Sequence, residues 1–216
     1  MGQLIAASDE QGAMGARQLR DELMVSFLAG YETTALSLQW TLHLLTQHPA
    51  VEARLLDEIR QLGGRPPALE DLRQMPYVAA VRNEVMRLYP AVPYIPRQAA
   101  ADDIIEGFHI PAGALIFVGA WHIQRDPALW GEDAAQFRPE RWLSAAPVPH
   151  RGAFIPFSIG GRVCIGQHLA EVELDLALIA LLQRFRVVRT TREEIKPLAV
   201  FTLRPMPDIF MALETR

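Results

Sequence analysis

The sequence has very little cysteine: Cys164 is the only one in 216 residues. A single cysteine excludes a disulfide framework and a multi-cysteine zinc site within this chain. The sequence also lacks any apolar run near the roughly 18 residues that a membrane-spanning helix needs, so no membrane segment is predicted. Its formal charge of −4 gives no bulk attraction for nucleic acid, which is therefore not an expected partner.

Half of the residues are hydrophobic and 21% are charged, which is typical of a folded globular protein of one large or two small domains. Prolines concentrate between Pro90 and Pro156. Before that stretch the pattern is helical. After it, the pattern predicts one more helix and a strand-like tail. The sequence therefore predicts a mainly α fold with small β-sheets.

Hydrophobic spacing predicts four helices. Arg17–Gln47 has no proline and carries leucines at helical intervals. Pro49–Gln61 begins at a proline and is followed by two glycines, as is common at helix ends. A third helix is expected over Tyr77–Tyr89, just before a proline. An amphipathic fourth helix is expected over Gly166–Arg184.

The remaining segments predict short strands and loops. Residues 91–122 are expected to form short strands joined by turns, with Leu115–Val118 as a buried strand. Residues 125–156 show little periodicity and predict an irregular segment. Leu198–Leu213 predicts a hairpin that turns around Pro205–Asp208.

The strongest chemical signal is the segment from Phe157 to Gly166, which places Cys164 just before a helix. A lone buried cysteine is usually a small apolar residue. Here, however, Arg162 and the helix N-terminus both stabilise a thiolate, and glycines allow close approach of the backbone. Such a sulfur suits a metal ligand or a nucleophile. The nucleophile needs a base; His168 lies four residues further on, but no acid is placed to orient it.

A second signal lies at residues 29–34, in the middle of the longest helix. Gly30 costs about 1 kcal/mol there relative to alanine. Threonine hydroxyls can bond the carbonyl four residues back and distort a helix. The sequence therefore weakens this helix at one place, as functional sites often do. Glu32 beside Thr33 could relay protons; the alternative is an ordinary glycine packing contact with a solvated glutamate.

Two weaker signals concern charged residues. Glu84 and Arg87 are one helical turn apart, a spacing that in isolation indicates a surface ion pair worth a few tenths of a kcal/mol. The irregular stretch contains Pro139, Glu140 and Arg141 in succession. An arginine held in that stretch could join Glu84 and Arg87 in a buried network.

Together, the four motifs resemble the C-terminal half of a cytochrome P-450, a haem-thiolate monooxygenase. The family pattern F-x-x-G-x-R-x-C-x-G matches residues 157–166 at every fixed position. The pattern A-G-x-[D/E]-T matches residues 29–33, E-x-x-R matches 84–87, and P-E-R matches 139–141. The resemblance implies a long central helix, an E-x-x-R helix, a meander, a cysteine-ligand loop, a final helix and a β-hairpin.

The resemblance implies haem b as the cofactor, with Cys164 as the thiolate ligand of its iron. Arg162 and Arg97 correspond to residues that pair with the haem propionates, Phe157 packs beside the sulfur, and Gly166 belongs to the same cofactor loop. The implied structural network that fixes the meander consists of Glu84, Arg87 and Arg141.

The resemblance also implies where the protons, the electrons and the substrate of the reaction come from. Glu32 and Thr33 correspond to the residues that deliver protons to O₂. A ferredoxin or reductase is the implied electron donor. The segments that correspond to the substrate pocket suggest a small apolar substrate, and their residues are Ala29, Val92, Tyr94, Ile95, Val200 and Phe201.

Members of the family are much longer, and this sequence resembles only their C-terminal half. We therefore expect residues 1–216 to form a single truncated unit, with apolar surface left uncovered on the long helix. Two alternatives to an active monooxygenase are a non-catalytic haem-binding fragment and half of a split protein that needs an N-terminal partner. A cytoplasmic location is expected.

Overall fold

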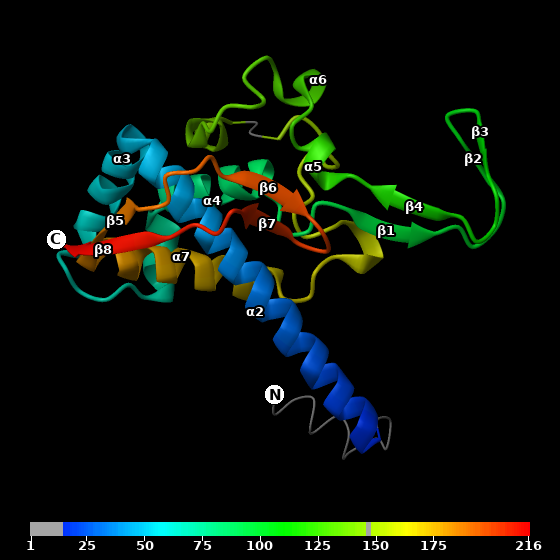
Figure 1. Cartoon of the computed structure of the whole chain (residues 1–216), viewed down its shortest axis with the longest axis horizontal. Coiled ribbons are helices and arrows are strands. Elements are labelled where there is room, and N and C mark those ends of the chain that lie inside the picture. The colour runs from blue at the N-terminus through cyan, green and yellow to red at the C-terminus, as the bar shows by residue number, and fades with distance from the viewer. Residues whose placement is uncertain (1–14, 146–147) are drawn as a thin grey trace.

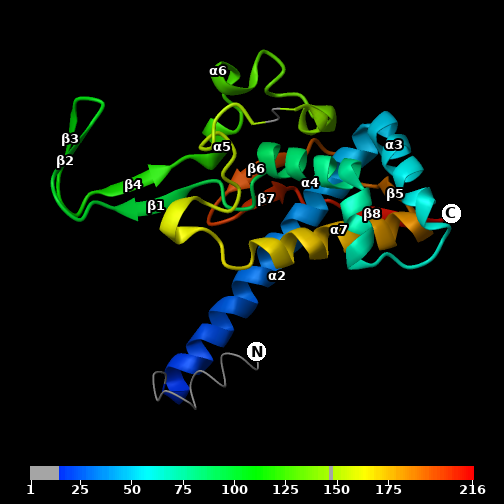
Figure 2. The same cartoon turned by 180° about the vertical axis from the view of Figure 1, so that it is seen from behind.

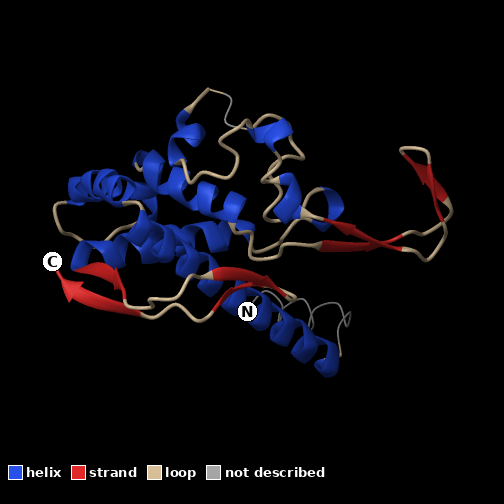
Figure 3. Cartoon of the chain, turned by 45° about the horizontal axis from the view of Figure 1, so that its top comes forward, coloured by secondary structure: helices blue, strands red, loops and turns tan. Residues whose placement is uncertain are grey.

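The computed structural model describes residues 15–145 and 148–216. Within them the chain is mainly helical, and its strands form four two-stranded antiparallel sheets. The helices make one body, and the strand pairs lie at its edge or extend from it (Figure 1 and Figure 3). The predicted class, mainly α with small β-sheets, is confirmed. No helix in these two ranges is both long enough and apolar enough to cross a membrane.

The longest helix, α2, runs from Ala16 to Gln47 without interruption. It confirms the predicted helix to within one residue. It ends where Pro49 follows, because proline disfavours helical geometry in the residue before it. Its buried side chains, from Leu36 to Leu45, all lie toward the C-terminal end. The N-terminal half projects from the body of the molecule (Figure 1 and Figure 2).

Two further helices confirm their predictions to within about two residues. Helix α3 spans Pro49–Ile59 and continues as the 3₁₀ turn η1, Arg60–Leu62. Gly63 then takes a φ of 60°, a left-handed conformation that ends the helix and that glycine adopts without steric cost. After a second 3₁₀ turn, η2 (Leu69–Gln74), helix α4 spans Pro76–Leu88.

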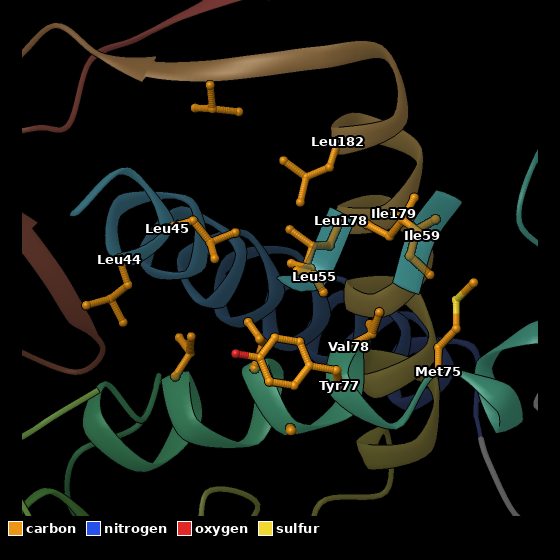
Figure 4. Packing of buried hydrophobic residues seen from close by; sticks show 14 of the residues in the cluster. Leu44, Leu45, Leu55, Ile59, Met75, Tyr77, Val78, Leu178, Ile179 and Leu182 are labelled. Atoms are coloured by element: carbon orange, nitrogen blue, oxygen red, sulfur yellow. The ribbon is translucent and has the colours of Figure 1, made fainter. Parts of the chain in front are cut away.

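Helix α7, Gln167–Arg184, packs against α2, α3 and α4, and these four helices enclose the main core (Figure 4). The amphipathic spacing of each helix supplies one apolar stripe to this core. Each leucine or isoleucine buried there contributes about 1.5–3 kcal/mol. The side chains that meet include Leu44, Leu45, Leu55, Ile59, Val78, Leu178, Ile179 and Leu182.

A ribbon of strands extends from the helical body (Figure 1). Strand β1 (Ile95–Gln98) pairs with β4 (Leu115–Val118), so the predicted strand is present. Its predicted burial is wrong, because the ribbon extends away from the core and leaves Leu115 and Phe117 exposed at 68% and 61%. The far end of the ribbon carries the hairpin of β2 (Asp103–Ile105) and β3 (Phe108–Ile110). Both residues of its tight turn have positive φ, 50° and 84°, which matches the twist of the paired strands.

The stretch after β4 contains only short helices, as its weak periodicity predicted. Helix α5 spans Ala120–Ile123, α6 spans Pro127–Trp130, and the 3₁₀ turn η3 spans Pro139–Leu143. A further 3₁₀ turn, η4 (Gly160–Arg162), precedes α7. The Arg87 side chain of α4 donates hydrogen bonds to three carbonyls of this stretch. Its conformation therefore depends on the helices beside it.

The C-terminal strands differ from the single hairpin that was predicted. Strand β6 (Lys196–Ala199) pairs with β7 (Leu203–Met206), so their turn lies between them at residues 200–202. Strand β8 (Met211–Thr215) pairs instead with β5 (Phe185–Arg189), which directly follows α7. The predicted turn around residues 205–208 is wrong, because this segment carries the chain from one sheet to the other.

The prolines explain why that turn was misplaced. Pro205 lies inside β7, opposite Pro197 of β6. Each strand of a two-stranded sheet has one edge without a ladder partner, so a proline facing that edge costs no hydrogen bond. The true turn is closed by the backbone N–H of Val200, which donates to the carbonyl of Thr202 at 3.2 Å. The proline cluster therefore marks the exit from the sheet.

Candidate functional site

The loop from Phe157 to Gly166 folds back on itself and holds Cys164 in place. The backbone N–H of Cys164 donates to the carbonyl of Phe157 at 2.9 Å, and that of Ser158 donates to Ile155 at 3.0 Å. The loop ends at Gly166, which is the N-cap residue of α7. The cysteine is therefore fixed by backbone hydrogen bonds immediately before a helix N-terminus, as the sequence predicted.

Two residues of this loop have left-handed backbone conformations. Gly160 has a φ of 74°, and an added Cβ there would meet no atom within 4 Å, so the glycine is required by conformation rather than by crowding. Ser158 has a φ of 66°, which costs a residue with a side chain about 1–2 kcal/mol. Gly166 has an ordinary φ of −89°, and its Cβ position lies 3.9 Å from the Cys164 sulfur.

The thiol of Cys164 is free and exposed. Helix α7 begins three residues later, so Cys164 immediately precedes a helix N-terminus, which carries partial positive charge. His168, the residue considered as a base, is exposed on α7, and no hydrogen bond joins it to Cys164 within the described ranges. The structure therefore provides no activated cysteine–histidine pair, and the metal-ligand interpretation is the better supported one.

Cationic and apolar residues lie on the cysteine loop or contact it. Arg97 of β1 donates from Nη2 to the Ser158 hydroxyl at 3.1 Å, so the structure brings it to the cysteine loop, and its pairing with a haem propionate stays a prediction. Arg162 lies exposed on the same loop. Apolar side chains next to the cysteine are also exposed, and Ile165 is fully so at 105%. This surface fits a large apolar ligand that carries carboxylates, because arginine pairs well with carboxylate.

Thr33 of α2 behaves as the sequence suggested, but the helix does not break. Its hydroxyl donates to the carbonyl of Ala29, four residues back, at 2.7 Å. The expected irregularity is absent, since α2 is continuous through Gly30. A Cβ added at Gly30 would meet no atom within 4 Å, so the alternative of a close glycine packing contact is not supported within the described residues.

Glu32 is held by the β6–β7 hairpin. The Thr202 hydroxyl donates to its carboxylate at 2.7 Å, and Arg204 Nε donates to the same oxygen at 3.0 Å. These hydrogen bonds, with that from Thr202 the strongest, hold the pKa of Glu32 below its usual value. No local pattern indicates these partners, because they lie about 170 residues away along the chain.

The residues expected to line a substrate pocket lie in separate places. Val200 and Phe201 are 72% and 77% exposed at the tip of the β6–β7 hairpin. They line a groove of about 580 Å³ together with Glu32. Tyr94 and Ala29 are exposed, and Val92 and Ile95 are partly buried; none of these four lines that groove.

Glu84 and Arg87 form a buried pair rather than the surface pair that their spacing alone indicated. Both side chains are 0% exposed, and Arg87 Nε and Nη2 donate to the Glu84 carboxylate at 2.8 and 2.9 Å. Arg141 Nε donates to Glu84 at 2.9 Å, and Trp142 Nε1 does so at 2.9 Å. The structure therefore brings together the three predicted network residues and adds Trp142, which the sequence did not indicate.

Arg87 also organises the irregular stretch. Its Nη1 atom donates to the carbonyls of Gln124 and Ala134 at 2.7 Å each, and its Nη2 atom donates to Gln136 at 3.2 Å. Its guanidinium lies 5.0 Å from the centre of the Trp130 ring. A buried charge is tolerated only when its donors and acceptors are satisfied. This network meets that condition and fixes the chain that leads to the cysteine loop.

Comparison with known proteins places these features in a family. The model of the cytochrome P-450 family matches residues 2–211. The chain is 38% identical over 187 residues to LUTEIN DEFICIENT 5, chloroplastic, of Arabidopsis thaliana, which covers 84% of this chain and 31% of that protein. It is 35% identical over 203 residues to pentalenene oxygenase of Streptomyces avermitilis, covering 93% of this chain and 45% of that protein.

A third relative is the mitochondrial 1,25-dihydroxyvitamin D(3) 24-hydroxylase of Rattus norvegicus, 34% identical over 209 residues, covering 96% of this chain and 40% of that protein. The chain therefore belongs to the cytochrome P-450 family, and its fold is a C-terminal portion of the family fold. It spans 31% to 45% of the length of these curated relatives. A cytoplasmic location stays a prediction, since two of the names are chloroplastic and mitochondrial.

Proposed function

We propose that this chain carries the haem-thiolate site of a monooxygenase that inserts one atom of O₂ into a small apolar substrate. The observation that carries the proposal is the exposed Cys164 thiol, fixed before the N-terminus of α7 on a surface shared with Arg97 and Arg162. Bound haem b would supply O₂ activation, and a thiolate ligand favours cleavage of the O–O bond.

The residues of this chain would divide the work of binding. Cys164 would ligate the iron through its deprotonated sulfur. Arg97 and Arg162 would pair with the propionates, in charge-assisted hydrogen bonds. Phe157 and Gly166 begin and end the loop that holds Cys164, and Phe157 would pack beside the sulfur; its carbonyl already accepts the cysteine N–H.

The residues of α2 would supply protons. Thr33 has a hydroxyl that can exchange its present bond to the Ala29 carbonyl for one to an external oxygen. Glu32 would relay protons from solvent as a carboxylate, and because hydrogen bonds from Thr202 and Arg204 hold its pKa below the usual value, it would hold each proton only transiently. Electrons would come from a ferredoxin or reductase, and the exposed apolar tip at Val200 and Phe201 would contact the substrate.

Isotope labelling tests the proposal. Haem-loaded protein, a surrogate ferredoxin and reductase, and ¹⁸O₂ are incubated with two apolar probes, a monoterpene and a medium-chain fatty acid. We expect one labelled oxygen per product, and none from Cys164→Ser. Thr33→Ala should lower product per NAD(P)H consumed, whereas Thr46→Ala should not, although Thr46 also bonds a carbonyl of α2. Absence of labelled product even when an N-terminal half from a relative is added would overturn the proposal.

A second candidate function rests on α2. Large apolar side chains on its projecting half are 54% to 69% exposed: Met24, Val25, Phe27, Leu28 and Tyr31. We propose as the alternative that the chain binds haem without turnover, or binds neither haem nor substrate, until an N-terminal polypeptide covers this face. Under this alternative, labelled product forms only after that polypeptide is added. Turnover by the chain alone would contradict it.

A further inference from the structure

Gln124 connects the buried network of α4 to the cysteine loop. It directly follows α5, and its uncharged amide side chain is 0% exposed. A buried amide is costly unless each of its polar atoms has a partner. Its hydrogen bonds therefore show what this residue does.

Each polar atom of the Gln124 side chain is bonded to backbone. Its Nε2 atom donates to the carbonyls of Met86 and Arg87, at the end of α4, at 2.9 and 3.1 Å. Its Oε1 atom accepts the N–H of Ile155 at 2.7 Å. Its own carbonyl accepts from Arg87 Nη1 at 2.7 Å. Gln124 therefore links the C-terminal end of α4 to the backbone of Ile155.

Ile155 lies at the entrance of the cysteine loop. Its carbonyl accepts the N–H of Ser158 at 3.0 Å, and the Phe157 carbonyl accepts the N–H of Cys164 at 2.9 Å. A path therefore leads from the Glu84–Arg87 pair to Cys164. It runs by hydrogen bonds through Gln124 to Ile155, along the chain to Phe157, and by a hydrogen bond to Cys164.

We propose that Gln124 is a positioning residue, which fixes the cysteine loop relative to α4 and so sets the direction of the Cys164 sulfur. The effect on the loop rests on the structure alone, whereas its consequence for haem ligation rests on the proposed function. Arg87 fixes the irregular stretch, and Gln124 transmits that rigidity to the loop.

Glutamine is the residue type that this position requires. The site needs two donors toward the carbonyls of α4 and one acceptor toward the Ile155 N–H, which an amide supplies in a planar arrangement. Leucine has a similar size but leaves three backbone groups without a partner. Glutamate has the same shape, but its ionised form places a negative oxygen against two carbonyls. Protonation restores one donor, so glutamate should act as a pH-dependent partial substitute.

Amide hydrogen exchange of the chain without haem tests the loop directly. In Gln124→Leu, we expect protection factors at Ser158 and Cys164 to fall about tenfold or more relative to those of the α7 amides. The matched control is Val81→Ala, a fully buried α4 residue of the main core, which should change all protected amides together. A uniform change in both variants would overturn the proposal.

Two further readouts separate positioning from simple destabilisation. In Gln124→Glu, the lost protection of Ser158 and Cys164 should return as the pH falls and the new carboxyl is protonated; a pH-independent loss would overturn the proposal. In haem-loaded protein, Gln124→Leu should raise the fraction of the reduced, CO-bound spectrum that lacks thiolate character, and Val81→Ala should not. If wild-type protein shows no thiolate spectrum, the proposed function fails while the exchange result still decides the role of Gln124.

Discussion

Arg204 of β7 donates from Nε to the carboxylate of Glu32 on α2 at 3.0 Å, joining two residues 172 positions apart. The same carboxylate oxygen accepts the Thr202 hydroxyl. Because Thr202 follows directly after Val200 and Phe201, the acid of α2 and the apolar tip of the hairpin share one attachment. A movement of the tip would therefore change the hydrogen bonding of Glu32.

Removing that arginine should raise the pKa of Glu32. Its carboxylate is stabilised by donors from Thr202 and Arg204, so Arg204→Gln weakens the preference for the ionised form. Carboxyl ¹³C NMR titration should show a higher midpoint for Glu32 in this variant, and a higher one still with Thr202→Val added. Arg186→Gln, which breaks a surface pair in another sheet, is the control and should leave Glu32 unchanged. An unchanged Glu32 midpoint in Arg204→Gln would contradict the assignment.

Breaking the buried Glu84–Arg87 pair should destabilise the chain strongly. Arg87→Ala leaves a buried carboxylate with one partner fewer and several carbonyls without donors, for which we expect a loss of about 3–5 kcal/mol. Urea denaturation measures it. Arg60→Ala, which removes an exposed pair with Asp57, should cost about 0–1 kcal/mol. Equal losses from the two variants would refute the buried network.

Asp175 should make stability fall as the pH rises. Its Oδ2 atom accepts from Arg82 Nη1 at 2.6 Å, while Oδ1 is buried and has no hydrogen-bond partner among residues 15–145 and 148–216, and burial raises the pKa from 3.8 to about 6. The folded state therefore binds the proton more tightly than the unfolded state. This stabilisation is complete below pH 3.8 and is lost as the pH rises through about 6.

The expected size of this effect is about 3 kcal/mol at most between those two pH values. Unfolding free energies of wild type and Asp175→Asn are compared across the window, so that the slopes of other carboxyl groups cancel. Wild type should lose stability relative to the variant as the pH rises. The opposite slope would show that the ion pair with Arg82 outweighs burial.

The projecting half of α2 should tolerate polar substitution. Phe27 is 66% exposed and stacks on Tyr31, so Phe27→Ser should change the unfolding free energy by about 0.5 kcal/mol or less. It should also reduce self-association in sedimentation experiments, because an exposed apolar patch promotes association. Leu178→Ala in the core is the comparison and should cost about 2–5 kcal/mol. A comparable cost at Phe27 would mean that this face is already covered.

Features coded by local pattern could be predicted from the sequence. The bounds of α2, α4 and α7 follow from helical spacing and from the prolines and glycines that end it. The glycines and the cysteine at residues 157–166 predict the cysteine loop before α7. Long-range pairing could not be predicted in this way. No local pattern indicates that Glu32 contacts Arg204, or that β8 pairs with β5 rather than with β7. None indicates that Gln124 is buried with every polar atom of its side chain hydrogen-bonded.

The most direct test of the account is the visible spectrum of the haem-loaded chain, reduced under CO. The account predicts a strongly red-shifted Soret band for wild type, lost in Cys164→Ser and retained in His168→Ala, because Cys164 supplies the ligand and His168 is an exposed neighbour. A spectrum typical of free or histidine-ligated haem in wild type, unchanged by Cys164→Ser, would contradict the claim that Cys164 forms the thiolate site.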